Sequence, residues 1–353
     1  MNENVSFSTS SKPDRRVTQQ DVAEAVGVSR SAVSMAFKNH PRISTQMRER
    51  IRATAAQLGY EPDPMLAALA AYRNRRRPTG FHGTLAWLVS SKGGYSWNRI
   101  RQFAEFFEGA RSAAQRHGFQ LEVFDLAKSG GQLGRVAAVL RARNVMGVAV
   151  APQPEAGTVL TDFPWEDFSA VALGYTLAEP RLHVVAAAQF HAAVECLRRL
   201  RETGHKRIGF LLSREHVERT QLQYLGAWMA SQEMAGLGGQ VPAALMDKDH
   251  KPGPFREWMK RYKPDGIISG DYLPGHLRRL GWRVPEDVSV ACPNLASDGG
   301  AVSGVWEVPF NSGAAAADLL VSLIHRGERG VPETPQTVLV EGRWMEGKTL
   351  RAR

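Results

Sequence analysis

A closely spaced set of helix-start and helix-stop residues near the N-terminus constrains the fold more than any other feature of this sequence. In "VTQQDVAEAVGVSRSAVSMAF" (residues 17–37), Thr18 is followed three residues later by Asp21, the spacing of a capping box. Gly27 is suited to end that helix, and Ser29 to cap a second helix two residues later. Helices joined by so short a turn must pack against each other, which predicts a helix-turn-helix.

A third helix is predicted from Ser44 through "STQMRERIRATAAQL", and Gly59 is suited to end it. Three short helices would enclose a small apolar core. The side chains expected in that core are Val22, Val33, Phe37, Ile51, Ala55 and Leu58. A helical bundle without any ligand would show the same pattern, so the bundle by itself does not define a function.

The second predicted helix carries an apolar residue on its outer side. Val33 and Phe37 are four residues apart on one face, whereas Ser31 and Met35 are four apart on another. The chain has a formal net charge of +10, and residues 1–80 hold 13 Lys and Arg against 7 Asp and Glu, an excess of 6. Such a basic segment is either a solvated surface or a surface that binds nucleic acid.

Together with "RISTQMRERIRATAAQLGYEPDP", the first stretch resembles the DNA-binding head of the LacI family of bacterial transcriptional regulators, over about 45 residues. The resemblance implies that the second helix enters the major groove. Arg30, Ser31 and Met35 would then face base edges. Arg30 would either bond to guanine or hold a phosphate, whereas Met35 offers only apolar contact, for example to a thymine methyl group. Many family members have a polar or basic residue there, so we expect a less guanine-directed specificity.

The resemblance also implies backbone contacts and a hinge. Contacts to phosphates are implied for Thr18, Ser34, Arg42 and Ser44, although a helix-capping or solvated role fits each of them equally well. In "YEPDPMLAALAAYRNRRRPTG" (residues 60–80), a short segment matches the family's hinge helix. Leu69, followed by Ala70, would wedge between base steps in the minor groove. The open alternative is a linker helix that lies on the next domain.

From Phe81 onward, short apolar runs alternate with segments of helical periodicity, for example "TLAWLV", "GVAVAP" and "GIISG". Alternation of this kind predicts parallel sheets covered by helices, and a region this long favours two α/β lobes. The phrases "GHKRIGFL", "KPDGIISGD" and "RVPEDVSVA" resemble strand entries of the LacI family effector domain, which is itself similar to the periplasmic sugar-binding proteins. The whole-chain prediction is therefore a small all-α helix-turn-helix domain followed by a two-lobed α/β domain of the periplasmic-binding-protein type. The predicted parts are a disordered tail (1–16), the head (17–62), a hinge with a basic linker (63–80) and an effector-binding and dimerisation domain (81–349).

Ligands of such sheets bind beyond the carboxyl ends of the strands. By position, the polar ligand contacts of the family fall near Thr220, Gly270 and Asn294, where many sugar-binding members carry Arg, Asn and Asp. Arg219 and Asp271 stand beside the first two, so a shifted contact, a changed sugar specificity or a lost one all remain open. Further candidates are aromatic residues that would either stack on a ligand ring or pack in the core. These are Tyr95, Trp97, Tyr272 and Trp306.

Several classes of protein do not fit the sequence. The N-terminus lacks the apolar region of a signal peptide, Cys196 and Cys292 are too few for a disulfide framework, and no phosphate loop, nucleophile elbow or metal-ligand spacing occurs. We therefore expect a cytoplasmic regulator that is not an enzyme and needs no cofactor, metal or membrane.

Its expected partners are double-stranded DNA with a pseudo-palindromic operator, a second copy of the chain as a homodimer, and a small, sugar-like effector. The expected activity is repression. The alternatives are a sugar-binding module without DNA-linked regulation and an effector-independent repressor.

Overall fold

The helix-start and helix-stop residues of the N-terminal segment act as the sequence predicts. Thr18 begins α1 (Gln19–Val26) in a complete capping box with Asp21, and Gly27 ends this helix at a φ of 78°. At the start of α2 (Arg30–Phe37), the Ser29 hydroxyl accepts a hydrogen bond from the Ala32 amide at 3.2 Å. Ser44 caps α3 (Thr45–Gln57). The predicted helix-turn-helix is confirmed.

The core of these helices contains Val22, Val33, Ile51 and Ala55, as expected. Phe37 is partly buried and packs against this core, with its ring 5.5 Å from that of Tyr60. The prediction for Leu58 is wrong, because its side chain is 40% exposed. At Gly59, which has a φ of 71°, the chain reverses, and the Tyr60 amide donates to the carbonyl of Ala55. Tyr60 therefore packs on the core where the helical period alone had placed Leu58.

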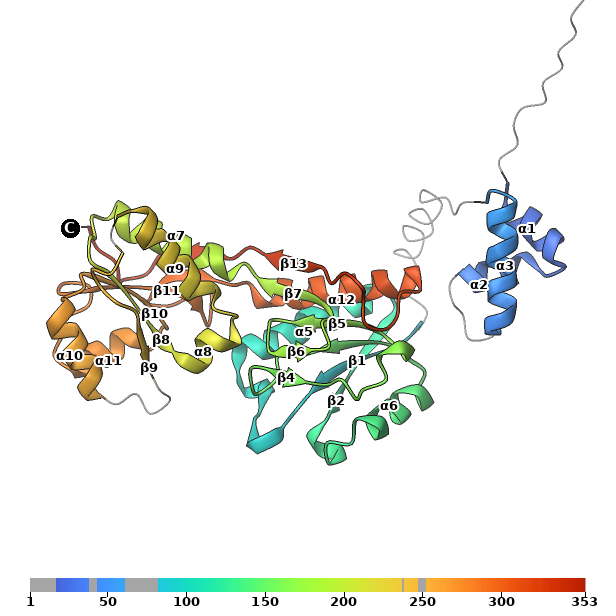
Figure 1. Ribbon diagram of the computed structural model, residues 1–353, viewed down its shortest axis with the longest axis horizontal. Coiled ribbons are helices and arrows are strands. Elements are labelled where there is room, and N and C mark those ends of the chain that lie inside the picture. Colours follow the sequence, from blue (N-terminus) through green and yellow to red (C-terminus); the bar gives the residue numbers. More distant parts are fainter. Residues whose placement is uncertain (1–16, 38–42, 61–81, 237, 247–251, 353) are drawn as a thin grey trace, which may run out of the picture. The chain divides into compact units, whose positions relative to one another are not determined.

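The computed structural model describes residues 17–37, 43–60, 82–236, 238–246 and 252–352. The chain divides into two compact units, residues 1–79 and 80–353, and each is described by itself (Figure 1). In the described part of the second unit, two six-stranded sheets form two lobes. The two-lobed α/β prediction is confirmed.

The sheet of the first lobe has the order β13-β7-β5-β3-β1-β2, and its neighbouring strands are parallel. Its strands are β1 (Gly83–Val89), β2 (Phe119–Asp125), β3 (Val145–Val150), β5 (Ser169–Leu173), β7 (His183–Ala187) and β13 (Thr337–Val340). Along β1, Leu85 and Trp87 enter one core while Ala86 and Leu88 enter another, because successive side chains of a strand point to opposite faces. Helices α5 (Arg101–Arg116) and α12 (Pro309–Arg326) cover the first face, and α6 (Leu133–Ala142) covers the second. A separate pair is formed by β4 (Thr158–Val159) and β6 (Leu177–Glu179).

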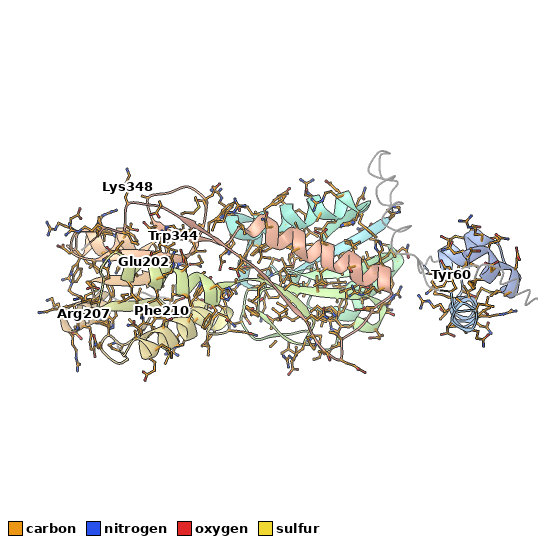
Figure 2. The ribbon with its side chains drawn as sticks, turned by 90° about the horizontal axis from the view of Figure 1, so that it is seen from above. Tyr60, Glu202, Arg207, Phe210, Trp344 and Lys348 are labelled. Carbon is orange, nitrogen blue, oxygen red and sulfur yellow. The ribbon has the colours of Figure 1, made fainter. Side chains whose placement is uncertain are left out.

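The sheet of the second lobe has the order β14-β12-β11-β10-β8-β9, and only the β12–β14 pair is antiparallel. Its strands are β8 (Ile208–Ser213), β9 (Ala244–Met246), β10 (Gly266–Ser269), β11 (Ser289–Leu295), β12 (Ser303–Trp306) and β14 (Arg343–Met345). One face packs on α7 (Gln189–Glu202) and α9 (Gln223–Met234), and the other on α10 (Pro252–Tyr262) and α11 (Leu273–Arg279). Figure 2 labels Phe210, which is fully buried under the first pair, and Trp344 on β14. The Arg199 guanidinium lies 5.1 Å from the centre of the Trp344 ring.

The chain passes between the lobes at the segments that join β7 to α7, β12 to α12, and β13 to β14. At the second crossing Val308 has a φ of 45°, a backbone conformation that is costly for a β-branched residue. Beyond it, α12 packs closely on α5. A Cβ on Gly313 would lie 1.8 Å from the Phe106 carbonyl oxygen, and one on Gly109 would lie 1.9 Å from that of Phe310. None of the described helices combines the length and apolarity that a membrane-spanning helix needs.

Candidate functional site

The outer face of α2 is the candidate recognition surface of the N-terminal unit. Arg30 and Ser31 are exposed at its first turn. Met35, one turn further, is half-buried and does not belong to the group of described side chains that forms the core. Ser34 is half-buried. Arg30 and Met35 thus remain available to a partner that covers the start and middle of α2, whereas the Ser31 hydroxyl forms a hydrogen bond with that of Ser29 at 2.9 Å.

The hydroxyl groups predicted to touch phosphates already have partners within the head. Thr18 Oγ1 donates to Asp21 Oδ2 at 2.7 Å, and Ser44 Oγ accepts from the Met47 amide at 3.3 Å. Both therefore act as helix caps, and their contact with DNA stays a prediction. Arg42, Leu69 and Ala70 lie outside the described residues.

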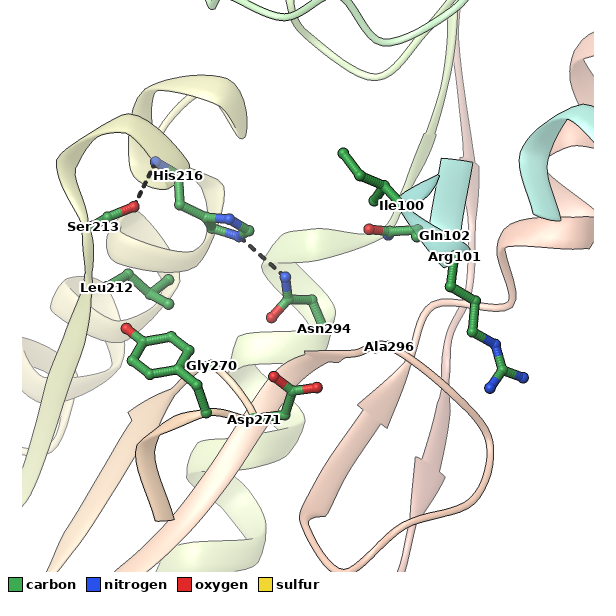
Figure 3. A pocket seen from close by; sticks show the side chains of 11 residues that line it. Ile100, Arg101, Gln102, Leu212, Ser213, His216, Gly270, Asp271, Asn294 and Ala296 are labelled. Carbon is green, nitrogen blue, oxygen red and sulfur yellow. Dashed lines mark hydrogen bonds between the residues drawn. The ribbon is translucent and has the colours of Figure 1, made fainter. Parts of the chain in front are cut away.

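In the second unit, a cavity of about 260 Å³ lies between the two lobes (Figure 3). The second lobe contributes the carboxyl ends of β8, β10 and β11 together with the first turn of α8 (Arg214–Arg219), and the first lobe contributes the start of α5. The carboxyl ends of neighbouring parallel strands lie at one edge of a sheet, which is where ligands bind in folds of this type. The lining residues are Ile100, Arg101, Gln102, Leu212, Ser213, His216, Gly270, Asp271, Tyr272, Asn294 and Ala296.

A neutral histidine and an amide form one polar side of the cavity. Asn294 Nδ2 lies 3.1 Å from His216 Nε2, and the His216 amide donates to Ser213 Oγ at 3.1 Å (Figure 3). Burial, aided by the nearby Arg219 charge, lowers the pKa of His216 to about 4. His216 is therefore uncharged at neutral pH and accepts the hydrogen bond from Asn294.

An aromatic ring and a carboxylate stand on the loop after β10. The Tyr272 ring is so close to Gly270 that a Cβ there would lie 2.4 Å from Tyr272 Cε1, so this position requires a residue without a side chain. Tyr272 is 41% exposed. Asp271 is also exposed, and no described side chain forms an ion pair with it. The ring and the carboxylate are both accessible to a molecule in the cavity.

Behind the cavity wall, a fully buried carboxyl group joins side chains of both lobes. Glu307, between β12 and α12, accepts a hydrogen bond from Gln102 Nε2 at 2.7 Å and another from the Tyr224 hydroxyl. The Gln189 side chain forms a further hydrogen bond with it. Burial raises the pKa of Glu307 to about 7 despite these bonds. The group connects α5 of the first lobe with α7 and α9 of the second.

The predicted effector residues fall into two sets. Asp271, Tyr272 and Asn294 line the cavity, although Asp271 and Tyr272 lie 23 and 22 residues before Asn294. Five other predicted side chains do not line it, namely Tyr95, Trp97, Arg219, Thr220 and Trp306. Arg219 Nη1 donates to the carbonyls of Gln153 and Pro154 in the first lobe, at 2.8 and 2.6 Å.

The remaining four predicted residues have other surroundings. Tyr95 is half-buried, with its ring 6.4 Å from that of Phe103. Thr220 is buried, and its hydroxyl donates to the His216 carbonyl at 2.9 Å. Trp97 is half-buried, with its ring 5.4 Å from that of Phe107. Trp306 is half-buried at the end of β12. A role of these side chains in effector binding stays a prediction.

Sequence reasoning missed Gln102, His216 and Glu307. The rule that ligands bind after strand ends would have pointed to His216, because it stands shortly after "IGFLLS". Glu307 stands between "GVW" and "VPF", and this position was a second usable signal. An acidic residue within an apolar run is expected to have hydrogen-bond or charge partners. No local pattern identifies Gln102.

Known protein families match both the N-terminal head and the C-terminal two-lobed part of the chain. Residues 18–63 match the model "Bacterial regulatory proteins, lacI family", and residues 197–350 match "Periplasmic binding protein-like domain". The transcriptional regulator CelR of Thermobifida fusca is 28% identical over 306 residues, which cover 78% of this chain and 81% of CelR. GntR of Escherichia coli K12 is 26% identical over 290 residues, again 78% of this chain and 81% of the relative.

Solved structures share the fold at lower identity. A complex of CelR with cellobiose is 22% identical, with a TM-score of 0.56, and the match covers 95% of this chain and 100% of that one. A lac repressor dimer bound to operator and the anti-inducer ONPF is 16% identical, with a TM-score of 0.57, and covers 96% and 100%.

A helix-turn-helix head joined to a two-lobed domain with a cavity between the lobes defines a DNA-binding transcriptional regulator with a small-molecule effector domain. This chain belongs to the LacI family of bacterial transcriptional regulators.

Proposed function

We propose that the protein is a cytoplasmic repressor that binds a pseudo-palindromic operator as a homodimer and responds to a small, sugar-like effector in the cavity between its lobes. One head covers only a half-site, so a two-fold dimer is the geometric counterpart of a palindrome. Arg30, Ser31 and Met35 are the proposed base-facing residues. Asp271, Tyr272 and Asn294 are the proposed effector contacts.

The position of the cavity is the observation that carries the regulatory proposal. It is lined by both lobes, so a bound molecule has different contacts when the lobes change their arrangement. An effector alters DNA affinity only by binding two arrangements unequally. Arg219 on α8 donates hydrogen bonds to the segment after β3 in the other lobe. A change in the arrangement of the two lobes would break or strengthen this contact.

Met35→Arg tests the proposed recognition surface. A thioether offers no pair of hydrogen bonds to a base, whereas arginine bonds bidentately to guanine. We expect the preference to move toward guanine at one symmetric operator position, by about 1–3 kcal/mol per half-site. Selection of bound sites from random DNA, with parent and variant side by side, measures this change.

The matched control for this test is Gln57→Arg, which adds the same charge to the exposed end of α3 in the same head. It should strengthen binding to all sequences alike, because phosphate attraction carries no sequence information. Identical preferred bases for Met35→Arg and the parent would contradict the proposed docking of α2.

A second experiment uses the C-terminal unit alone. Residues 80–353 contain both sheets and their cores, so we expect this fragment to fold and to bind an effector without the head. A ligand at 100 times its dissociation constant should stabilise it by about 2.7 kcal/mol. Thermal-shift screening against sugars measures the effect. A folded fragment that responds to no sugar, while the full chain responds, would contradict an effector site confined to this unit.

A further inference from the structure

Resting on the proposed function, we infer that the cavity selects a ligand that is rich in hydrogen-bond donors and carries no negative charge. A neutral sugar or an amino sugar fits this description, whereas sugar acids and sugar phosphates do not. The determinants are the Asp271 carboxylate and the Gln102 amide, whose orientation Glu307 sets.

The cationic groups near the cavity are directed elsewhere. Arg101 is the only arginine or lysine among the lining residues, and its guanidinium donates to Glu105 at 2.7 Å with 61% of the side chain exposed. Figure 3 shows it extending away from His216 and Asn294. Arg219 donates to two backbone carbonyls. His216 is neutral because burial lowers its pKa to about 4. Among the described residues, an anion in the cavity would therefore find no positively charged side chain directed toward it.

The Gln102 amide presents an acceptor for a structural reason. Gln102 Nε2 donates to Glu307 Oε2 at 2.7 Å, and the ionised form of Glu307 holds the amide in this orientation, because a carboxylate only accepts hydrogen bonds. Gln102 Oε1 is then left for the cavity, into which the side chain points in Figure 3. Glu307 is itself fixed by Tyr224 from the second lobe, so Gln102 cannot easily turn over.

The other polar groups add further acceptors. Asn294 uses Nδ2 on His216 and is left with Oδ1, whose contact is the Cys292 thiol at 3.5 Å, a weak donor. The Asp271 carboxylate faces the cavity without an ion-pair partner among the described residues. Three acceptor sites thus surround a space toward which no cationic side chain of the described part of the chain is directed. Hydroxyl or ammonium groups satisfy such acceptors, whereas a second carboxylate beside Asp271 is repelled.

The test uses matched sets of compounds with the full-length protein. Each set keeps one skeleton and changes one group: glucose, glucosamine, glucuronate and glucose 6-phosphate; cellobiose and cellobionate; ribose and ribose 5-phosphate. Calorimetry should give the neutral or amino member an affinity at least about tenfold above that of the acid or phosphate, since like charges placed side by side cost this much or more. An acid or phosphate that binds as tightly as its neutral counterpart overturns the inference but leaves the proposed effector site intact. If no compound of any set binds, both the inference and the proposed effector site are contradicted.

Asp271→Asn keeps the shape of the side chain and removes its charge. It should reduce the neutral-to-acid preference by about tenfold and abolish any preference for the amino sugar. Asp162→Asn, an exposed carboxylate of the first lobe that does not line the cavity, is the control and should change neither ratio. Unchanged selectivity in Asp271→Asn removes this residue from the proposal.

A double-mutant cycle tests whether Glu307 acts through Gln102. In Glu307→Gln, the new amide can offer either its oxygen or its NH2 group to Gln102. The Gln102 amide can then turn over, which should weaken binding of the neutral sugar. In a Gln102→Ala background the same change should have no further effect on affinity, because the residue that transmits it is absent. Independent, additive losses would mean that Glu307 supports the fold but does not position the cavity wall.

Discussion

Gly313→Ala should destabilise the C-terminal unit by about 3 kcal/mol or more, at or beyond the upper end of the usual cost of overpacking. The added methyl group would lie 1.8 Å from the Phe106 carbonyl oxygen and 2.7 Å from its carbonyl carbon. Both atoms belong to the backbone of α5, so no side-chain rotation relieves the overlap, and α12 must move away from α5. Denaturant unfolding of parent and variant, followed by circular dichroism, measures the loss.

Gly134→Ala is the matched control. Gly134 is exposed in α6, and no atom lies within 4 Å of its potential Cβ. Alanine should stabilise that helix by about 0.5–1 kcal/mol, since it restricts the unfolded chain and favours helix. If Gly313→Ala were as stable as Gly134→Ala, the close approach of α5 and α12 would be wrong. Because α5 carries Gln102 and α12 follows Glu307, this helix pair also positions the cavity wall.

Glu307 should make stability depend on pH between about 5 and 8. Its pKa is raised to about 7 in the folded protein, mainly by burial, from an ordinary value of 4.5. A raised acid pKa means that the folded protein holds the proton more tightly than the unfolded chain does. The contribution to stability is therefore complete below about pH 4.5 and is lost as the pH rises through about 7. The expected loss between pH 5 and 8 is about 2–3 kcal/mol.

The measurement compares the parent with Glu307→Gln at several pH values. The variant has no proton to lose, so its advantage over the parent should grow with pH by about the same 2–3 kcal/mol. Around Glu307 the described partners are Gln102, Gln189 and Tyr224, while the Cys292 thiol interacts with it electrostatically. Burial raises the pKa of both Tyr224 and Cys292, so neither titrates in this range.

Glu166→Gln, at an exposed carboxylate in the first lobe, controls for the general effect of removing an acid. Its stability should follow the pH dependence of the parent. Parallel curves for the parent and Glu307→Gln would show that Glu307 is not held in a desolvated site.

The alternation of strands and helices in the C-terminal unit could be predicted because it depends on neighbouring residues. "TLAWLV" is buried on both faces as β1, and "GVAVAP" contains most of β3. Strands with weaker apolar runs, such as β7 with "HVVAA" and β14 with "RWM", were not predicted. β13 and β14 pair with strands of different lobes, and those pairings decide their structure.

The cavity was predicted less completely than the fold. Strand-end reasoning, together with the positions that the family resemblance implied, pointed to Asp271, Tyr272 and Asn294, which line the cavity on one lobe. Their contact with an effector stays a prediction. Strand-end reasoning could not add Gln102, because the start of α5 reaches the cavity only through the packing of one lobe against the other. Nor could it foresee that Thr220 turns its hydroxyl to the carbonyl of His216.

The sequence by itself determined the helix-turn-helix head. Capping by Thr18 and Ser44, and the left-handed backbone at Gly27, involve groups only a few residues apart, so a short stretch of sequence contains all the atoms that decide them. Only the tertiary structure decided that Gln102 and Glu307, 205 residues apart, share a hydrogen bond behind the cavity. The physical reason is that a buried carboxyl group takes its partners from whatever elements pack around it. That packing is set by the order of the strands and the crossings between the lobes, not by the neighbouring sequence.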